Sequence, residues 1–366
     1  MFNGVFKDKK ILITGHTGFK GSWLSLWLKN MGAFVIGYSL KPPTTPNHFD
    51  ILKLDKEIIS ITGDIRDKEK LENTFKKYRP EVVFHMAAQP IVRDSYTNPF
   101  ETYEINVMGT LNVLQACRTT DSVKSVLLIT TDKCYENKEW VYGYREVDAL
   151  GGYDPYSSSK ACAEILINSF RKSFFNLNDY GQKHTTLISS VRAGNVIGGG
   201  DWGNDRLIPD IIRAITNKEE LIVRNPKAVR PWQHVLEPLS GYLMLSQKLL
   251  EGDVSKAEAW NFGPQESNHV EVEELVKLTK KYWSAFDYSF NTNNTKDNPH
   301  ESQFLRLDCS KAYNLLGWKP VWNFEKSLLK TIEWYRNYYE KIIASTCEDI
   351  LEYIKDAENK NLNWVS

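Results

Sequence analysis

The amino-acid sequence predicts an α/β protein built around a parallel, doubly wound sheet, with a smaller C-terminal domain. Short β-type runs alternate with helical stretches up to about residue 191, which is the pattern of parallel sheets with crossover helices. A glycine-rich turn joins the first strand to the first helix. Polar residues follow several strands, at the edge where such sheets bind ligands. Together these three observations indicate a Rossmann-type fold.

The glycine-rich turn lies between the first strand and the first helix. The apolar run Ile11–Thr14 leads into Gly15-His16-Thr17-Gly18-Phe19-Lys20-Gly21, and residues 22–30 follow as a helix. Glycines in such a turn let backbone amides approach a pyrophosphate at the helix N-terminus. The spacing is GxxGxxG rather than GxGxxG. A dinucleotide site and a plain strand-to-helix turn therefore both remain open.

The second strand, 34–39, ends without the acidic residue that commonly binds an adenosine ribose. It runs into Leu40-Lys41-Pro42-Pro43 instead. Lys41 is either a ligand for a 2′-phosphate or a solvated loop lysine, and we favour the solvated lysine. This strand by itself leaves the choice between NAD and NADP open.

The rest of the sheet continues the same alternation. We expect strands at 58–63, 82–88, 126–131 and 185–191, and helices at 67–78, at 98–117 and from Pro155 onward. The residues that follow the strands are Asp64 and Ile65 after the third, and Asp132 and Lys133 after the fifth. Ala87 and Ala88 close the fourth strand and leave space for a cofactor.

The sequence changes in character after Arg192. A glycine-rich loop at 193–202 precedes expected helices at 207–215, 237–250, 270–283 and 326–339, a polar loop at 286–302 and a helical tail. The run at 260–263 is expected to rejoin the sheet as a last strand. We therefore predict a dinucleotide-binding domain of residues 1–195, rejoined by about 231–263, and a second domain of residues 196–230 and 264–366.

The stretch that carries chemistry is Tyr156-Ser157-Ser158-Ser159-Lys160. Asp154 is a good N-cap and Pro155 suits the first helical position, so a helix begins here. Tyr156 and Lys160 are four residues apart and lie on one face. The nearby ammonium and the helix N-terminus favour a phenolate, which can accept a proton from a sugar hydroxyl. YxxxK alone is common by chance, and an ordinary amphipathic helix also explains it.

Composition excludes several other classes of protein. With 46 Lys+Arg against 46 Asp+Glu, the balanced charge gives no argument for a nucleic-acid or anionic-membrane partner. The five cysteines form no CxxC, and the seven histidines show no metal-binding spacing, so neither a disulfide framework nor a metal is expected. A core strand by Ile11 leaves no room for a signal peptide, and no apolar run is long enough to cross a bilayer. We expect a cytoplasmic protein.

In this order the residues resemble those of extended short-chain dehydrogenase/reductases, in the branch that modifies nucleotide sugars. The resemblance covers nearly the whole chain and rests on Thr14–Gly21, Asp64-Ile65, His85–Gln89, Asn106, Thr131-Asp132 and Tyr156–Lys160. Within that branch the CDP-glucose 4,6-dehydratases are the most similar. That similarity lies in the long runs Gly15–Leu24, Val191–Trp202, Arg230–Tyr242 and Leu307–Lys311.

The resemblance implies a lyase of deoxysugar and O-antigen (lipopolysaccharide) precursor biosynthesis, which dehydrates CDP-glucose to the 4-keto-6-deoxy sugar with a tightly held NAD. It implies hydride-transfer roles for Tyr156 and Lys160, a sugar hydrogen bond for Thr131, and acid catalysis at carbon 6 for Asp132. The implied cofactor-binding residues are Gly15, Thr17, Gly18, Phe19, Lys20, Gly21, Asp64, Ile65, Ala87, Ala88, Gln89, Tyr156 and Lys160. The implied substrate-binding residues, which assign the nucleotide sugar largely to the second domain, are Gln89, Asn195, Arg206, Arg230 and His300.

Several alternatives remain open at this stage. Lys133 stands where dTDP-glucose dehydratases have a glutamate, so it is either the base at carbon 5 or the partner of Asp132 or Glu136 in an ion pair. Arg206 has a helix-capping alternative, and His300 a plain loop position. Another nucleotide-sugar 4,6-dehydratase, a 4-epimerase and an inactive cofactor-binding protein are the competing functions. Relatives associate through the 98–117 and YxxxK helices, so a homodimer or homotetramer is expected.

Overall fold

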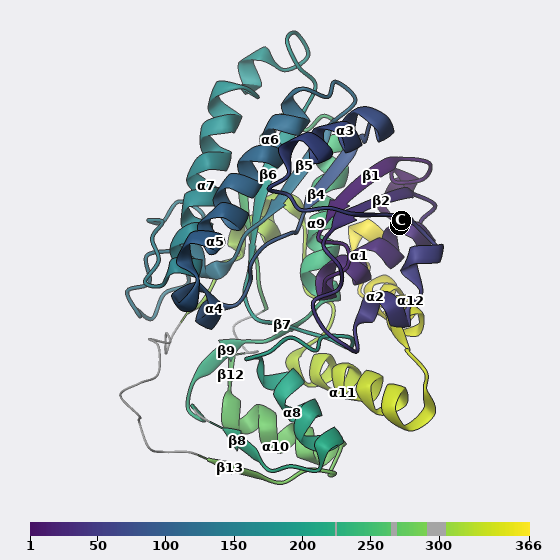
Figure 1. The fold of residues 1–366 in the computed structure, drawn as a ribbon, viewed down its shortest axis with the longest axis vertical. Helices are drawn as coiled ribbons and strands as arrows, with labels where there is room; N and C mark the ends of the chain where they lie inside the picture. Colours follow the sequence, from purple (N-terminus) through teal and green to yellow (C-terminus); the bar gives the residue numbers. More distant parts are fainter. Residues whose placement is uncertain (224, 265–268, 291–304) are drawn as a thin grey trace.

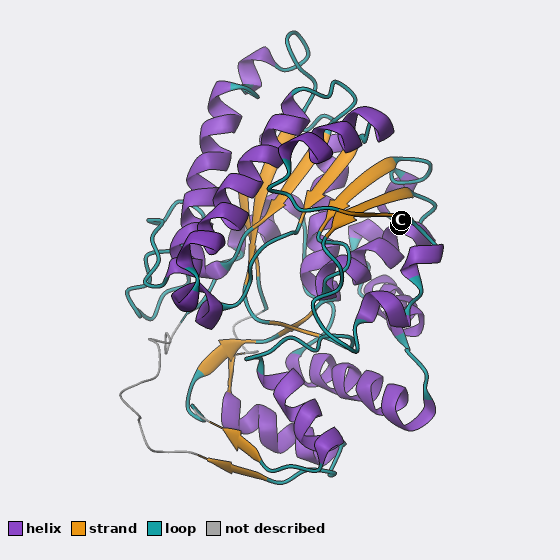
Figure 2. Ribbon diagram, in the orientation of Figure 1, coloured by secondary structure: helices purple, strands orange, loops and turns teal. Residues whose placement is uncertain are grey.

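The computed structural model describes residues 1–223, 225–264, 269–290 and 305–366. Within them a seven-stranded parallel sheet has the order β11-β6-β5-β4-β1-β2-β3 (Figures 1 and 2). Its strands are β1 (Lys10–Thr14), β2 (Phe34–Ser39), β3 (Ile59–Thr62), β4 (Val82–His85), β5 (Ser125–Ile129), β6 (Leu187–Ala193) and β11 (Ala259–Phe262). The predicted doubly wound sheet is confirmed. So is the late return of the chain, because β11 pairs with β6.

The strands are apolar on both sides, and successive residues supply two separate cores. In β1, Ile11 and Ile13 join one buried cluster while Leu12 joins the other, as the two-residue period of a strand requires. The cluster around Leu12 is completed by helices α3 (Lys68–Tyr78), α6 (Gly109–Arg118) and α7 (Pro155–Ser173). The opposite cluster receives α1 (Phe19–Asn30) and α9 (Leu236–Leu250). Figure 2 shows helices on both sides of the sheet.

The helix expected at 98–117 is present but irregular in its middle. It begins as α5 (Pro99–Tyr103), passes through a π-helical segment at Glu104–Met108, and continues as α6. Asn106 lies in the π-helical segment and donates its amide to the Gln89 carbonyl (3.1 Å) and to Ser159 Oγ (2.9 Å). The irregular turn therefore links the segment after β4 to the helix that carries Tyr156.

The second half of the chain adds a region below the sheet in the view of Figure 1. One correction concerns the loop predicted at 286–302, because Tyr288–Phe290 is a strand, β13, paired with β8 (Leu221–Val223). Its Ser289 is exposed while Tyr288 and Phe290 are half-buried, a short alternation that the polar surroundings obscure in the sequence. The helices and other strands here are α8 (Leu207–Asn217), α10 (Val272–Tyr282), α11 (Phe324–Lys341), β7 (Val196–Ile197), β9 (Val229–Pro231), β10 (Gln233–His234) and β12 (His269–Glu271).

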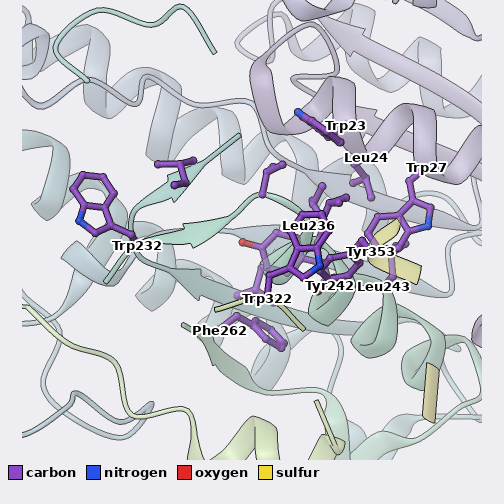
Figure 3. Close-up of a cluster of buried hydrophobic side chains, with 14 of the residues drawn as sticks. Trp23, Leu24, Trp27, Trp232, Leu236, Tyr242, Leu243, Phe262, Trp322 and Tyr353 are labelled. Carbon is purple, nitrogen blue, oxygen red and sulfur yellow. The ribbon is translucent and has the colours of Figure 1, made fainter. Parts of the chain in front are cut away.

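Aromatic side chains dock the C-terminal helix α12 (Thr346–Asn359) against α1 and α9 (Figure 3). Tyr353 meets Trp27 of α1 edge to face, with ring centroids 6.0 Å apart, and its hydroxyl donates to Glu237 of α9 (2.8 Å). The last helix thus packs beside the sheet, and the division into two domains stays a prediction. Two short helices, α2 (His48–Ile51) and α4 (Val92–Thr97), complete the fold. No helix in the described ranges has the length and apolarity that crossing a membrane requires.

Candidate active site

Helix α7 begins where the sequence predicts, and this positions its first turn. Asp154 accepts a hydrogen bond from the Ser157 backbone N–H (2.8 Å) and another from the Ser157 hydroxyl (2.6 Å). This cap and Pro155 at the first turn direct Tyr156 and Lys160, both buried, toward the sheet. Lys160 Nζ donates to the carbonyl of Ile129, the last residue of β5 (3.3 Å).

Directly after β5 the chain brings three candidate catalytic groups together. Thr131 caps a short 3₁₀ turn, Asp132–Cys134, and its hydroxyl donates to Asp132 Oδ1 (3.0 Å). The Tyr156 phenol forms a hydrogen bond with the same Thr131. The Asp132 side chain is only 3% exposed. A carboxyl group, a hydroxyl and a phenol therefore lie within one hydrogen-bonded chain at the carboxyl edge of the sheet, where ligands bind in open α/β folds.

The electrostatic surroundings of Tyr156 differ from the sequence-based expectation. The pKa of Tyr156 is raised to about 12, chiefly by burial and also by the Asp132 charge, although the hydrogen bond with Thr131 and the Arg206 charge oppose the rise. The expectation of a favoured phenolate is therefore wrong for this structure, because desolvation outweighs the neighbouring donors. Burial also lowers the pKa of Lys160 to about 8, while Glu164 works to raise it.

Lys133 lies at the rim of this group. Its Nζ is 3.9 Å from Asp132 Oδ1, and 34% of its side chain is exposed. The ion-pair alternative is therefore present in the structure, with Asp132 as the partner. A role as base at carbon 5 stays a prediction, and the exposure of Lys133 gives it access to a sugar beside Asp132.

The glycine turn fits a dinucleotide. Gly15 has φ +79°, and a Cβ there would lie 2.7 Å from the Ala87 nitrogen, so only glycine lets the turn pack against β4. A Cβ on Gly21 would meet the Gly15 carbonyl at 2.1 Å. Gly18 caps α1 without any side-chain hydrogen bond, so the first amides of α1 are left for an anion. The tight turn thus offers the cradle that a pyrophosphate requires.

The other predicted cofactor residues surround this turn in different ways. The Thr17 hydroxyl donates to the Leu40 carbonyl (2.9 Å) and holds the turn against the end of β2. Asp64 pairs with Arg66 (2.7 Å), and that guanidinium holds the pKa of Asp64 below its usual range. The remaining positions follow: Phe19 packs against Gly198, and Ile65 packs against Gly109. Ala87 and Ala88, predicted to close the fourth strand, lie half-buried just after β4, which already ends at His85.

Lys20 is the predicted cofactor residue with the most charged neighbours. The pKa of Lys20 is lowered to about 8, chiefly by burial. The positive charges of Arg206 and Lys160 add to this lowering, whereas the negative charges of Asp132 and Asp201 oppose it. These influences place Lys20 in the same electrostatic cluster as Asp132 and Lys160. Lys41, by contrast, is exposed in the loop after β2.

The predicted substrate residues are only partly brought together. Gly194 lies against the Asp132 carboxyl group, because a Cβ on Gly194 would be 3.0 Å from Asp132 Oδ2 and 2.9 Å from Pro231 Cγ. Asn195 directly follows Gly194 in the chain, and its carbonyl accepts from the Gln233 N–H (3.1 Å). Arg230 directly precedes Pro231 in β9. The Arg230 guanidinium donates to the Val229 carbonyl (3.0 Å).

Arg206 and Gln89 have partners of their own within the protein. Arg206 occupies the N-cap position of α8 without a side-chain capping hydrogen bond, and its guanidinium forms an ion pair with Asp201 (2.8 Å). The Gln89 amide exchanges hydrogen bonds with the backbone of Ile91 (2.7 and 3.0 Å). His300 lies outside the described residues.

Sequence reasoning missed three residues close to the site. Gly194 abuts Asp132, Asp201 pairs with Arg206, and Glu164 continues the face of α7 that carries Tyr156 and Lys160. The spacing 156, 160, 164 was available in the sequence as a signal for Glu164. The other two positions depend on contacts between segments far apart in the chain.

Comparison with known proteins places this site in a family. The family described as "GDP-mannose 4,6 dehydratase" matches residues 12–331. A CDP-glucose 4,6-dehydratase of Salmonella typhimurium is 49% identical over 95% of this chain and 97% of its own length. A CDP-paratose 2-epimerase of Salmonella typhi is 28% identical over 89% of this chain and 98% of its own length.

Solved structures agree on the fold. A dTDP-glucose 4,6-dehydratase from Streptomyces venezuelae, solved with NAD bound, has a TM-score of 0.74 at 22% identity and covers 90% of this chain and 98% of its own. A UDP-glucose 4-epimerase from Thermotoga maritima also has a TM-score of 0.74, at 23% identity, covering 90% and 99%. Since the family match extends over most of the chain and includes the glycine turn, Thr131-Asp132 and Tyr156–Lys160, this protein belongs to the GDP-mannose 4,6 dehydratase family.

Proposed function

We propose that this protein is a CDP-glucose 4,6-dehydratase, a hydro-lyase that converts CDP-D-glucose to CDP-4-keto-6-deoxy-D-glucose. The observation that carries the proposal is the 49% identity, over nearly the full length of both chains, to a protein of that name. The geometry supports it, since a buried carboxyl group, Asp132, shares a hydrogen-bonded chain with Thr131 and Tyr156. A dehydratase requires such an acid beside its tyrosine, because a hydroxyl must be protonated as it leaves.

The cofactor that fits the glycine turn is NAD. NAD supplies a hydride acceptor for carbon 4 of the sugar and a hydride donor for carbon 6. Since the cofactor ends each turnover unchanged, the reduced NADP pool of a cell offers no advantage, and tight retention of NAD is expected. The exposed Lys41 is then a solvated lysine. Denaturing the purified protein and weighing the released cofactor tests this, and recovery of mainly NADP would make Lys41 a phosphate ligand.

The side chains divide the proton transfers among themselves. Tyr156 accepts the proton of the 4-hydroxyl, with Thr131 as its hydrogen-bond partner and the Lys160 ammonium on the same helix face. A ketone at carbon 4 makes the carbon 5 proton acidic, and Lys133 is the candidate base for it. Asp132 then donates a proton to the hydroxyl leaving carbon 6. The low exposure of Asp132 keeps bulk water from supplying that proton.

The nucleotide sugar itself contacts the second half of the chain. Arg206 and Arg230 carry the charges suited to a diphosphate, and Asn195 adds an amide next in sequence to Gly194. Arg206 already pairs with Asp201, so it contributes to the diphosphate as a member of that pair. Recognition of cytosine rests on the sequence similarity. A panel of CDP-, dTDP-, UDP- and GDP-glucose, compared by kcat/KM, tests the base preference.

One assay separates the proposal from its competitors. The protein is incubated with CDP-glucose and the product is weighed. Loss of one water supports the dehydratase, an isomer of unchanged mass indicates an epimerase, and recovery of unaltered CDP-glucose indicates an inactive binding protein. A 4-epimerase needs no acid for carbon 6, so the buried Asp132 beside Tyr156 favours the dehydratase.

We further propose that the protein assembles as a homodimer or homotetramer through α5, α6 and α7. Large apolar side chains are exposed along this surface, namely Phe100 (73%), Met108 (50%) and Ile165 (58%). Exposed apolar groups on adjacent helices are typical of a covered interface. Light scattering of the purified chain tests the assembly.

We also propose a cytoplasmic location and a role in supplying deoxysugars for O-antigen precursors. The five free cysteines fit a reducing compartment such as the cytoplasm.

A further inference from the structure

Directly behind the YxxxK pair lies an acid that the proposed chemistry does not use. Glu164 is one turn beyond Lys160 on α7, and its side chain is only 2% exposed. Tyr156, Lys160 and Glu164 are each four residues apart, so they form one line along the face of α7 that meets the sheet. A charged group this deeply buried requires specific partners.

Glu164 has a full set of such partners, and they lie on two neighbouring strands or directly after them. Its Oε1 accepts from the Thr130 hydroxyl (2.5 Å), and its Oε2 accepts from Ser190 Oγ (2.8 Å) and from Arg192 Nη2 (2.7 Å). Thr130 directly precedes the Thr131-Asp132 pair. The carboxylate therefore connects the catalytic helix to the carboxyl ends of β5 and β6.

The partner cation is equally enclosed. The Arg192 side chain is 4% exposed, and its Nη1 donates to the Tyr135 hydroxyl (2.7 Å). Although burial works to raise the pKa of Glu164, Arg192 and the hydrogen bonds from Thr130 and Ser190 bring it below its ordinary value. Glu164 is thus a fixed negative charge beside Lys160.

The titratable groups around Lys160 come from several elements. Glu164 lies on its own helix, Cys134 in the 3₁₀ turn after β5, Lys20 at the start of α1 and His85 at the end of β4. Around Glu164 itself lie Arg192, Arg171 and Cys134. The Cys134 thiol is neutral, because burial raises its pKa. Glu164 is therefore the nearby group whose negative charge offsets the desolvation of the Lys160 ammonium.

We propose that Glu164 is a positioning residue for the reaction, which keeps Lys160 protonated and locks the Thr130–Asp132 segment against helix α7. The catalytic part of this inference rests on the proposed function, since it assigns Lys160 its role beside Tyr156. The electrostatic part concerns only the chain itself. Loss of the carboxylate lowers the affinity of Lys160 for its proton, so the ammonium disappears at a lower pH.

The test compares two substitutions in the full chain as purified. Glu164→Gln keeps the shape and removes the charge, whereas Glu164→Asp keeps the charge and shortens the side chain. Lysines carrying ¹³C at Cε are titrated by NMR, and the Lys160 signal is identified by its absence in Lys160→Met. We expect Lys160 to titrate at about 8 in the wild type and in Glu164→Asp, and at a lower pH in Glu164→Gln.

Two results would overturn the inference. In the first, Lys160 titrates at the same pH in Glu164→Gln as in the wild type. In the second, the titration of Lys160 moves to lower pH in Glu164→Asp by as much as in Glu164→Gln. The second result would mean that Glu164 acts through shape alone. If Glu164→Gln fails to fold because it leaves Arg192 unpaired, the double variant Glu164→Gln/Arg192→Met, which removes both charges, is titrated in place of the single variant. The same low titration of Lys160 is expected there, and a wild-type titration would refute the inference.

A kinetic measurement then tests the catalytic part. The descending, alkaline limb of kcat against pH is expected to shift to lower pH in Glu164→Gln, because the Lys160 ammonium is lost earlier, and Glu164→Asp is expected to restore the limb to its wild-type position. The NMR titration needs no substrate, whereas failure of the wild type to remove water from CDP-glucose would refute the dehydratase proposal alone. The two failures are therefore distinguishable.

Discussion

Glu237 offers the sharpest test of how burial and hydrogen bonding compete in this protein. Its side chain lies between α9 and the chain after residue 320, and it accepts hydrogen bonds from Val321 N–H (2.9 Å), Trp322 N–H (2.7 Å) and the Tyr353 hydroxyl (2.8 Å). Burial raises the pKa of Glu237 to about 7, although these three donors oppose the rise. Glu237→Gln removes the titration while keeping the size of the side chain.

The sign follows from proton linkage. Between pH 4.5 and 7 the unfolded chain has released the Glu237 proton while the native protein still holds it, so the wild type loses stability as pH rises through this window. A pKa difference from 4.5 to about 7 corresponds to about 3 kcal/mol at about 1.4 kcal/mol per pH unit. Most of this loss, about 2–3 kcal/mol, falls between pH 5 and pH 8.

Urea unfolding of the wild type and Glu237→Gln at both pH values measures the effect. The variant is expected to be less stable than the wild type at pH 5, because an amide cannot accept from both backbone donors as the carboxyl group does. Its deficit is expected to shrink by about 2–3 kcal/mol, or to reverse, at pH 8. Other titrating groups cancel in the difference. A deficit that is constant with pH, or that grows toward pH 8, would refute the reasoning and mean that the three donors outweigh desolvation.

Three further predictions concern the site. Tyr156→Phe is expected to keep the fold and the bound cofactor but to lower kcat by about 10²–10⁴-fold, which single-turnover formation of the 4-ketone measures; a near-wild-type rate would remove Tyr156 from the chemistry. Asp132→Asn is expected to oxidise carbon 4 and then stop, so quenched reactions should contain a 4-keto sugar that retains its 6-hydroxyl; unchanged turnover would make Asp132 a structural residue. Gly15→Ala is expected to lower both the melting temperature and the amount of cofactor retained, because its Cβ would lie 2.7 Å from the Ala87 nitrogen. Gly181→Ala is a matched control at the same φ of +79° with open space around it, and equal cofactor loss in both variants would exclude the contact with Ala87 as the cause.

The sequence was most informative where the physical cause is local. Asp154 and Pro155 determine the start of α7, and the four-residue spacing then places Tyr156 and Lys160 on one face. The glycine turn, the alternation of strands and helices, and the return of β11 to the sheet were likewise predictable. Each of these depends on backbone preference or hydrophobic pattern within a short stretch of chain.

Other features required the tertiary structure, because they arise from burial and from contacts between distant segments. The spacing of Tyr156 and Lys160 suggested a favoured phenolate, but the assembled site buries the phenol and raises its pKa to about 12. Gly194 shapes the space beside Asp132 although the two are more than 60 residues apart in the chain. The buried pair of Glu164 and Arg192 forms only when α7 packs on β6. A sequence pattern reports which groups a helix presents, whereas the desolvation and the partners of those groups are properties of the packed fold.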